Sequence, residues 1–300
     1  MIFEFRILGK SVAQSTRKTR VEVRLLSYRK YVNEPWRTIL ILVGAIIVSN
    51  SFIVFSNQDS RDFFTNWTIN AAAAAALSFS IITVITAYKR RVNRFLLEMY
   101  IIFTVGLTVW LVAELTWTYF QLVLQIGTPF PSSADAFWLS GYGFFTYFIF
   151  RIYNFLSKGN EKFIAVLVSL ATAIILGYIL NLTFGIADLL SAQEGSLAWL
   201  ISIAYPILDG ILLVPAVLIL WSLRGKNVAS ANWSLLAISL VVVTIADIGF
   251  GYSAVINKAG KDEWIWDLFY NSSYLIMSAA LFLQSRVFAK EGHAKIIVQK

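Results

Sequence analysis

The sequence predicts an all-α integral membrane protein with eight transmembrane helices, arranged as two parallel four-helix repeats with both termini in the cytoplasm. Three observations lead to this prediction. Of 300 residues, 58% are hydrophobic and 14% are charged, whereas soluble domains are about half apolar and a quarter charged. Apolar runs of about 20 residues recur, long enough to cross the hydrocarbon core as helices. Basic residues gather in alternate connections, as the positive-inside rule describes.

The predicted spans follow these apolar runs, and each span ends at a polar or charged connection. They cover residues 36–56, 67–88, 95–124, 135–155, 163–186, 197–222, 231–255 and 265–288. The first four spans form one predicted repeat, 36–155, and the last four form the other, 163–288. A short cytoplasmic tail, 289–300, follows the last span.

The charges of the connections orient the predicted bundle. Residues 89–94 read KRRVNR, and Arg151, Lys158 and Arg224 flank later connections on the same side. The alternate connections cover residues 57–66, 126–134, 187–196 and 257–264. These connections are poor in Lys and Arg, except that the last contains Lys258 and Lys261 beside two acids. This asymmetry predicts a multi-pass protein of the cell membrane with both termini cytoplasmic.

The segment 1–35 is strongly basic and precedes the first span. Its residues 10–35 intersperse apolar side chains among Lys and Arg. Two hypotheses stay open, a helix lying on anionic lipid of the inner leaflet, or a solvated arm that only sets orientation. The net charge of +8 follows membrane topology in either case, so we expect no nucleic-acid partner.

A shift of the chain by about 132 residues aligns two motifs. AELTWTY (113–119) falls on ADIGFGY (246–252), and DAFWLSGY (135–142) falls on DLFYNSSY (267–274). Two motifs in register on matching spans predict an internal duplication, and four-span units in tandem keep one orientation. The alternative is that aromatic residues were placed independently at the membrane interface.

The aligned motifs supply most of a candidate ligand-binding site. Carboxyl groups at membrane depth are costly and usually face the bundle interior, water or a partner. Asp135 and Asp267 are also placed to cap their helices, and Glu114 and Asp247 are placed to accept buried hydrogen bonds from neighbouring helices. If they line a pocket open to the outside, rings and carboxylates suit a cation or an amphipathic molecule. The candidate residues are Glu114, Trp117, Asp135, Trp138, Tyr142, Asp209, Asp247, Tyr252, Trp266, Asp267, Tyr270 and Tyr274.

Asp209 is a further acid, about midway through the sixth predicted span. Pro206, Gly210 and Pro215 surround it and weaken the local helix. A kinked helix with a mid-membrane carboxylate is typical of transport or gating sites, and equally of a packing kink whose acid is satisfied by a neighbour. The shift places Leu77 at this position in the first repeat, within an alanine-rich surface suited to close helix packing.

The composition excludes several chemistries. The chain has no cysteine and a single histidine, which excludes disulfides, thiolate chemistry and bis-histidine haem. No phosphate-binding loop, dinucleotide fingerprint or zinc-protease motif occurs. We therefore expect no cofactor, no metal and no enzymatic activity. Asn66 and Asn181 stand in low-specificity glycosylation sequons.

The stretch PFPSSADAFWLSGY (129–142), preceded by Glu114 and Trp117, resembles a known family. It is similar to the multi-span N-terminal membrane modules of prokaryotic signalling proteins, such as diguanylate cyclases and histidine kinases. YPILD (205–209) resembles a later motif of those modules, and Asp247 and the Trp266–Tyr270 element fit it more loosely. The resemblance covers about residues 36–288 and implies a sensory role. No output domain follows the last span here, so it implies a separate partner for any signal.

Three functions remain open on these grounds. The first is a stand-alone sensory or ligand-binding module in the lipid bilayer, with an outward-facing acidic and aromatic pocket for an unknown small ligand and a cytoplasmic signalling partner. The second is a small secondary transporter that uses Asp209 as its coupling carboxylate. The third is a structural subunit of a larger membrane complex.

Overall fold

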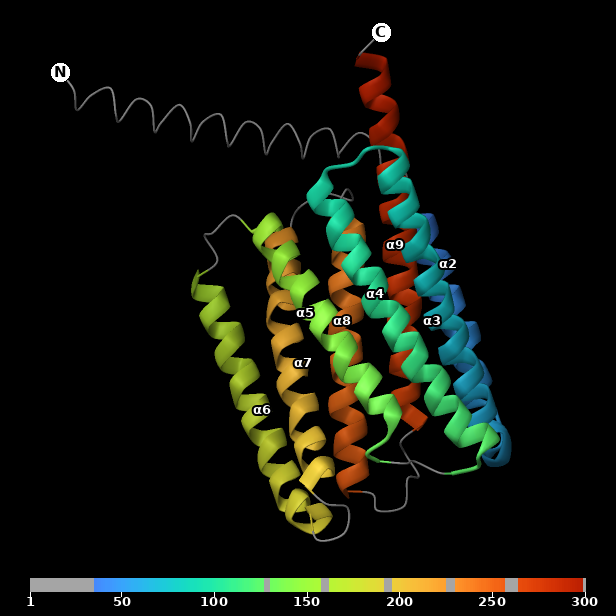
Figure 1. Ribbon diagram of the computed structural model, residues 1–300, viewed down its shortest axis with the longest axis vertical. Helices are drawn as coiled ribbons and strands as arrows, with labels where there is room; N and C mark the ends of the chain where they lie inside the picture. Colours follow the sequence, from blue (N-terminus) through green and yellow to red (C-terminus); the bar gives the residue numbers. More distant parts are fainter. Residues whose placement is uncertain are drawn as a thin grey trace, which may run out of the picture.

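The computed structural model describes residues 35–126, 130–157, 162–191, 196–224, 230–256 and 264–298. Every regular element in this part of the chain is helical, and eight long helices run side by side (Figure 1). They are α2 (Pro35–Val54), α3 (Gln58–Lys89), α4 (Arg94–Thr118), α5 (Ser133–Leu156), α6 (Lys162–Ser191), α7 (Ser196–Leu223), α8 (Ala231–Ile256) and α9 (Trp264–Val298). A π-helical turn, η1 (Tyr119–Val123), extends α4. Residues 1–34 of the basic N-terminal segment lie outside the described residues.

Six of the described helices are long and apolar enough to cross a membrane, namely α2, α3, α4 with η1, α6, α7 and α8. The predicted helical membrane protein is confirmed at this level. The remaining two, α5 and α9, run alongside the six (Figure 1), but they are not among the candidate spans found in the described residues. That all eight helices cross the membrane stays a prediction.

The start of α3 and the end of α9 differ from those predicted. The connection expected over 57–66 is mostly helix, because α3 begins at Gln58. Asp59 lies in its first turn, where a negative charge interacts favourably with the helix dipole and stabilises the helix. Asn66 therefore lies inside α3 with 4% of its surface exposed, so it is not an accessible glycosylation site. The tail expected over 289–300 continues α9 as helix to Val298, and α9 projects from the bundle (Figure 1).

Six helices close a ring. In order around it, α3, α4, α5, α7, α8 and α9 each pack against the next, and α9 packs back against α3. The helices α2 and α6 lie outside this ring, α2 against α9 and α3, and α6 mainly against α7. Their apolar side chains are accordingly exposed, with 73% of both Ile41 and Ile174 accessible, as expected of helices that face lipid.

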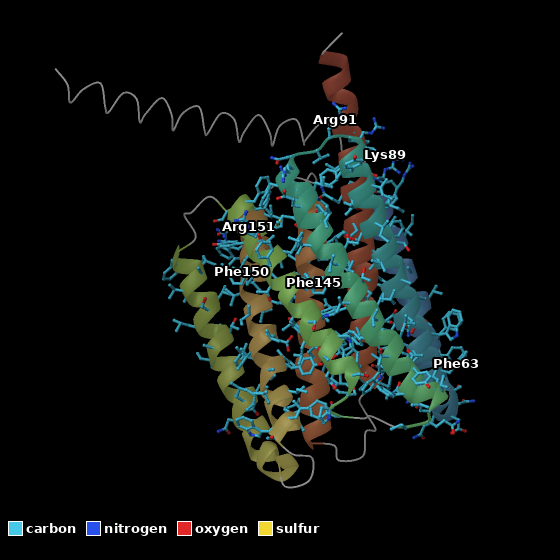
Figure 2. All side chains as sticks on the ribbon, in the orientation of Figure 1. Phe63, Lys89, Arg91, Phe145, Phe150 and Arg151 are labelled. Carbon is cyan, nitrogen blue, oxygen red and sulfur yellow. The ribbon has the colours of Figure 1, made fainter. Side chains whose placement is uncertain are left out.

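The interior of the ring is apolar toward one end. Phe103 and Phe145 are fully buried there, and the Phe103 ring packs against the Phe148 ring at a tilt, with ring centroids 4.7 Å apart. Figure 2 shows Lys89, Arg91 and Arg151 at or near this end and Phe63 at the opposite end. The half of the ring nearest the basic residues is thus filled by aromatic packing, which leaves the other half for polar side chains.

Candidate functional site

A network of carboxyl groups and ring side chains crosses the ring in the half remote from Lys89 and Arg91. We call it the carboxyl–tyrosine network. Its members are Glu114 from α4; Asp135, Trp138 and Tyr142 from α5; Tyr205 and Asp209 from α7; Asp247 from α8; and Tyr270 and Tyr274 from α9. All of them lie within about four helical turns of the helix ends at this side of the bundle.

Glu114 ties three helices together. One of its carboxyl oxygens, Oε1, accepts a hydrogen bond of 2.8 Å from the Tyr274 hydroxyl and one of 3.3 Å from the Trp138 indole N–H. Trp138 is held in turn, because the indole N–H of Trp110 donates to its carbonyl oxygen at 3.0 Å. Glu114 is half-buried, so it behaves as the interhelical acceptor that the sequence offered as one alternative.

Asp247 and Asp209 meet at a single hydroxyl group. The Tyr142 oxygen lies 2.6 Å from Oδ1 of Asp209 and 2.7 Å from Oδ2 of Asp247. The other oxygen of Asp247 accepts a bond of 2.5 Å from the Tyr270 hydroxyl. Asp209 is 1% exposed, and Tyr142 is equally buried. Tyr142 of α5 therefore links an acid of α7 with an acid of α8.

The contacts of Glu114 and Asp247 correspond residue by residue. Glu114 receives one bond from Trp138 on α5 and one from Tyr274 on α9. Asp247 receives one bond from Tyr270 on α9 and one from Tyr142 on α5. The shift of about 132 residues aligns Trp138 with Tyr270 and Tyr142 with Tyr274. Each acid is thus held once from its own half of the chain and once from the other half.

Asp209 breaks this correspondence. It gives the Tyr142 hydroxyl a second carboxyl contact, whereas Leu77 stands at the aligned position of the first half. The Tyr274 hydroxyl has one carboxyl partner, Glu114, among the described contacts. The ties of Glu114 and Asp247 are therefore symmetric, and Asp209 is an acid without a counterpart in the first half.

Asp135 combines two roles. Its Oδ2 accepts from the backbone N–H of Ser132 at 2.7 Å, and the Ser132 hydroxyl accepts from the N–H of Ala134, which together form a capping box at the start of α5. Its Oδ1 accepts from the Tyr205 hydroxyl of α7 at 2.9 Å. The capping role that the sequence offered for Asp135 is present, and a contact between the two halves is added to it.

The number of protons that the hydrogen bonds need indicates the protonation of the carboxyl groups. A phenol carries one proton and donates it once, yet the Tyr142 oxygen makes two short contacts with carboxyl oxygens. The second contact requires a proton on one of the two carboxyl groups. No Lys, Arg or His side chain pairs with Glu114, Asp209 or Asp247 in the part of the chain that the structure describes.

The other predicted site residues lie at the margin of this network. Trp117 packs on Trp138 with ring centroids 5.6 Å apart. Trp266 donates to the Ser253 hydroxyl at 2.7 Å, and Asp267 lies in the first turn of α9. The Tyr252 side chain is 46% exposed, and no described contact joins it to the network.

Two members were absent from the predicted site. Tyr205 precedes Pro206 and stands four residues before Asp209, a spacing that places both side chains on one helix face; this was the available signal. Trp110 lies between Tyr142 and Tyr274, with ring centroids 5.6 and 6.3 Å away. Trp110 stands four residues before Glu114, so the same spacing was the available signal.

Gly141 permits the approach of Trp110. A Cβ atom at position 141 would lie 2.1 Å from Trp110 Cδ1, so only glycine fits there.

The comparisons with known proteins add no further constraint. No protein-family model, no curated protein and no solved structure matches this chain.

Proposed function

We propose that this protein is a membrane-embedded sensory or ligand-binding module whose input site is the carboxyl–tyrosine network, and that its ligand is a cation, the proton being the smallest. The resemblance to the membrane modules of prokaryotic signalling proteins points to the same role. A signalling protein or a membrane complex then receives the output. The proposal includes eight membrane-spanning helices, two parallel repeats and cytoplasmic termini in the cell membrane.

The double contact of Tyr142 is the observation that supports this proposal. Glu114 and Asp247 have matching ties, which a scaffold built from two repeats would need. Asp209 has no counterpart, and it places a second carboxyl group on the one hydroxyl that joins α5 to α7 and α8. Two ionised carboxylates at this depth with no cationic partner are costly. The bridge therefore depends on a bound proton.

Loss of that proton changes the packing of the two halves. With both acids ionised, Tyr142 donates to one of them and the other loses its hydrogen bond. The titratable groups that face the pair are the phenols and acids of four helices, Tyr142 and Asp135 of α5, Tyr205 of α7, Glu114 of α4, and Tyr270, Tyr274 and Asp267 of α9. None of them supplies a positive charge to replace the proton.

The dependence of stability on pH tests this function. The folded pair holds a proton that two solvated aspartates of an unfolded chain have released at neutral pH, so the folded state binds more protons. The free energy of unfolding then falls as pH rises, by about 1.4 kcal/mol per pH unit for one proton. Asp209→Asn supplies a permanent N–H donor to Tyr142, and its thermal unfolding midpoint should depend less on pH.

Glu98→Gln is the matched control. Glu98 is an acid of α4 whose pair with Arg94 is exposed at the surface, and its removal should leave the pH dependence of the unfolding midpoint unchanged. Each variant is purified in detergent and followed by tryptophan fluorescence during heating. An Asp209→Asn protein with the same pH dependence as the wild type would overturn the proposal.

A secondary transporter is the second candidate, favoured by the placement of Asp209. It lies between Pro206 and Pro215 in α7, and prolines inside spans free backbone groups at transport sites. A transporter exposes its acid to both faces in turn, whereas a sensor needs access from one face. In proteoliposomes with an imposed pH gradient, a proton flux that Asp209→Asn abolishes would favour the transporter.

A further inference from the structure

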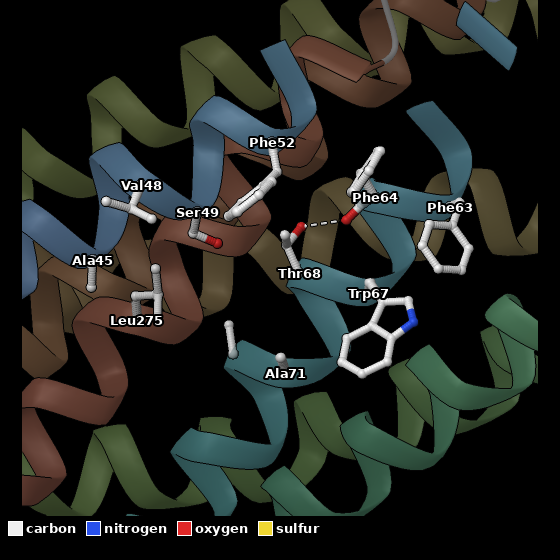
Figure 3. Close-up of a pocket in the computed structure, with 11 residues that line it drawn as sticks. Ala45, Val48, Ser49, Phe52, Phe63, Phe64, Trp67, Thr68, Ala71 and Leu275 are labelled. Carbon is white, nitrogen blue, oxygen red and sulfur yellow. Dashed lines mark hydrogen bonds between the residues drawn. The ribbon is translucent and has the colours of Figure 1, made fainter. Parts of the chain in front are cut away.

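A groove lies on the outer surface of the bundle, away from the carboxyl–tyrosine network. It has a volume of about 520 Å³, within the range of small-molecule sites. Its walls are α2 and α3, and Leu275 of α9 forms part of its floor (Figure 3). Because α2 and α3 are both candidate membrane spans, we expect this groove to face the lipid bilayer.

Small side chains give the groove its depth. Ala45 and Ser49 of α2 face Thr68 and Ala71 of α3 across it (Figure 3), and Ala72 also lines it. Small residues on neighbouring membrane helices normally allow the helices to approach closely. Here α2 packs mainly against α9 rather than α3, so the space above the small side chains stays open.

Aromatic rings close one end of the groove. Phe52 of α2 stacks on Phe64 of α3 with ring centroids 6.0 Å apart, and Phe63 meets Phe64 edge-on at 5.6 Å. Trp67 lies beside them (Figure 3) and is 63% exposed. Phe63, Phe64 and Trp67 stand within the first three turns of α3, and Phe52 lies in the last turn of α2; aromatic side chains commonly meet the membrane interface at such helix ends. The groove therefore runs from this end toward the middle of the membrane.

The hydroxyl groups in the lining are already engaged. The Thr68 hydroxyl donates to the carbonyl oxygens of Phe64 and Thr65 in its own helix. The Ser49 hydroxyl accepts from the side-chain amide of Asn271 at 2.8 Å. What remains for an occupant is apolar surface, which hydrocarbon satisfies and which a polar headgroup does not.

The aligned helices of the second half pack closely around Gly210. There α6 packs against α7, and a Cβ atom at Gly210 of α7 would lie 2.3 Å from Leu176 of α6. Thr172 fills the adjoining space, with one of its atoms 3.3 Å from the same point. The contact of α2 with α3 is therefore looser than that of α6 with α7.

We propose that this groove is a binding site for one hydrocarbon chain of a membrane lipid. The occupant lies along α2 and α3 with its chain on Ala45, Ala71 and Leu275 and its polar end beyond the aromatic rings. The site is independent of the proposed sensory function, because none of the network residues lines it.

Photolabelling tests this proposal. The protein is placed in nanodiscs that contain a phospholipid with a photoreactive acyl chain, and labelled peptides are mapped by mass spectrometry. We expect the label to concentrate on residues 45–52 and 63–72, several-fold above the exposed face of α6 at Val166, Leu170 and Ile174. Equal labelling of α6 would mean bulk lipid contact only and would overturn the proposal.

Two substitutions on one helix sharpen the test. Ala71→Phe fills the groove, whereas Ala74→Phe adds the same ring at an exposed position of α3 outside it. We expect a several-fold loss of label on α2 from the first and none from the second, and Ala45→Phe should repeat the loss from the opposite wall. Equal labelling of the two α3 variants, or crosslinks to a second protein chain across the groove, would contradict lipid as the occupant.

Discussion

Single residues of this protein are informative where they break a pattern. Glu114 and Asp247 interrupt apolar runs, and the cost of a carboxylate at membrane depth predicts that they find partners. The aligned motifs place Trp138 and Tyr270 among the candidate residues, but they do not predict which ring contacts which acid. The double contact of Tyr142 with Asp209 and Asp247 is not predictable in this way, because it depends on α5 packing against α7.

Two glycines of α5 differ sharply in their surroundings, although they stand two residues apart. A Cβ atom at Gly141 would meet Trp110 at 2.1 Å, while one at Gly143 would meet no atom within 4 Å. Trp110 packs against Phe145 at 4.5 Å between ring centroids and against Tyr142 and Tyr274, so it cannot move aside without disturbing the network.

Gly141→Ala should therefore lower stability, by about 1–3 kcal/mol for an overpacked core site. Gly143→Ala should leave stability unchanged or raise it by up to about 1 kcal/mol, because alanine favours the helix. Thermal unfolding of both variants in the same detergent measures the difference. Equal midpoints would show that Trp110 is not held as described.

The sequence predicts the existence of the helices better than the residues at which they begin and end. Each of the eight predicted spans corresponds to one described helix, because apolar length is a strong signal. The start of α3 was missed by nine residues, and the last predicted span ended at residue 288 whereas α9 continues to Val298, since polar residues in 57–66 and 289–300 are equally typical of loops and of helix that leaves the membrane.

The start of α5 is set by a cap rather than by hydropathy. The Ser132 hydroxyl accepts from Ala134 N–H at 3.2 Å, and Asp135 accepts from the N–H of Ser132. We expect Ser132→Ala to destabilise the protein by about 1 kcal/mol. Ser133→Ala, at the neighbouring exposed residue, is the control and should have little effect on the unfolding midpoint. A larger loss from Ser133→Ala would contradict the assignment of the cap.

The packing order of the six ring helices is the one that two parallel repeats would give, whereas the outer helices α2 and α6 pack differently from each other. The pairs α3–α4, α4–α5 and α5–α7 become α7–α8, α8–α9 and α9–α3 when each helix is exchanged for its aligned partner. The sequence predicted the duplication from two short motifs. It did not predict which six helices form the ring, because the hydropathy of α2 and α6 does not distinguish them from the helices that do. The repeat and its orientation stay predictions that can be tested together.

The natural lack of cysteine makes single-cysteine labelling a clean test of that orientation. Gln58 and Lys89 are exposed residues at the two ends of α3, about 48 Å apart along the helix. A membrane-impermeant maleimide added to intact cells should label Gln58→Cys, and should label Lys89→Cys only after lysis, because the basic end faces the cytoplasm. Arg224 follows α7, the helix aligned with α3. If the repeats are parallel, Arg224→Cys behaves like Lys89→Cys, whereas labelling of Arg224→Cys in intact cells would mean that the two halves are inverted.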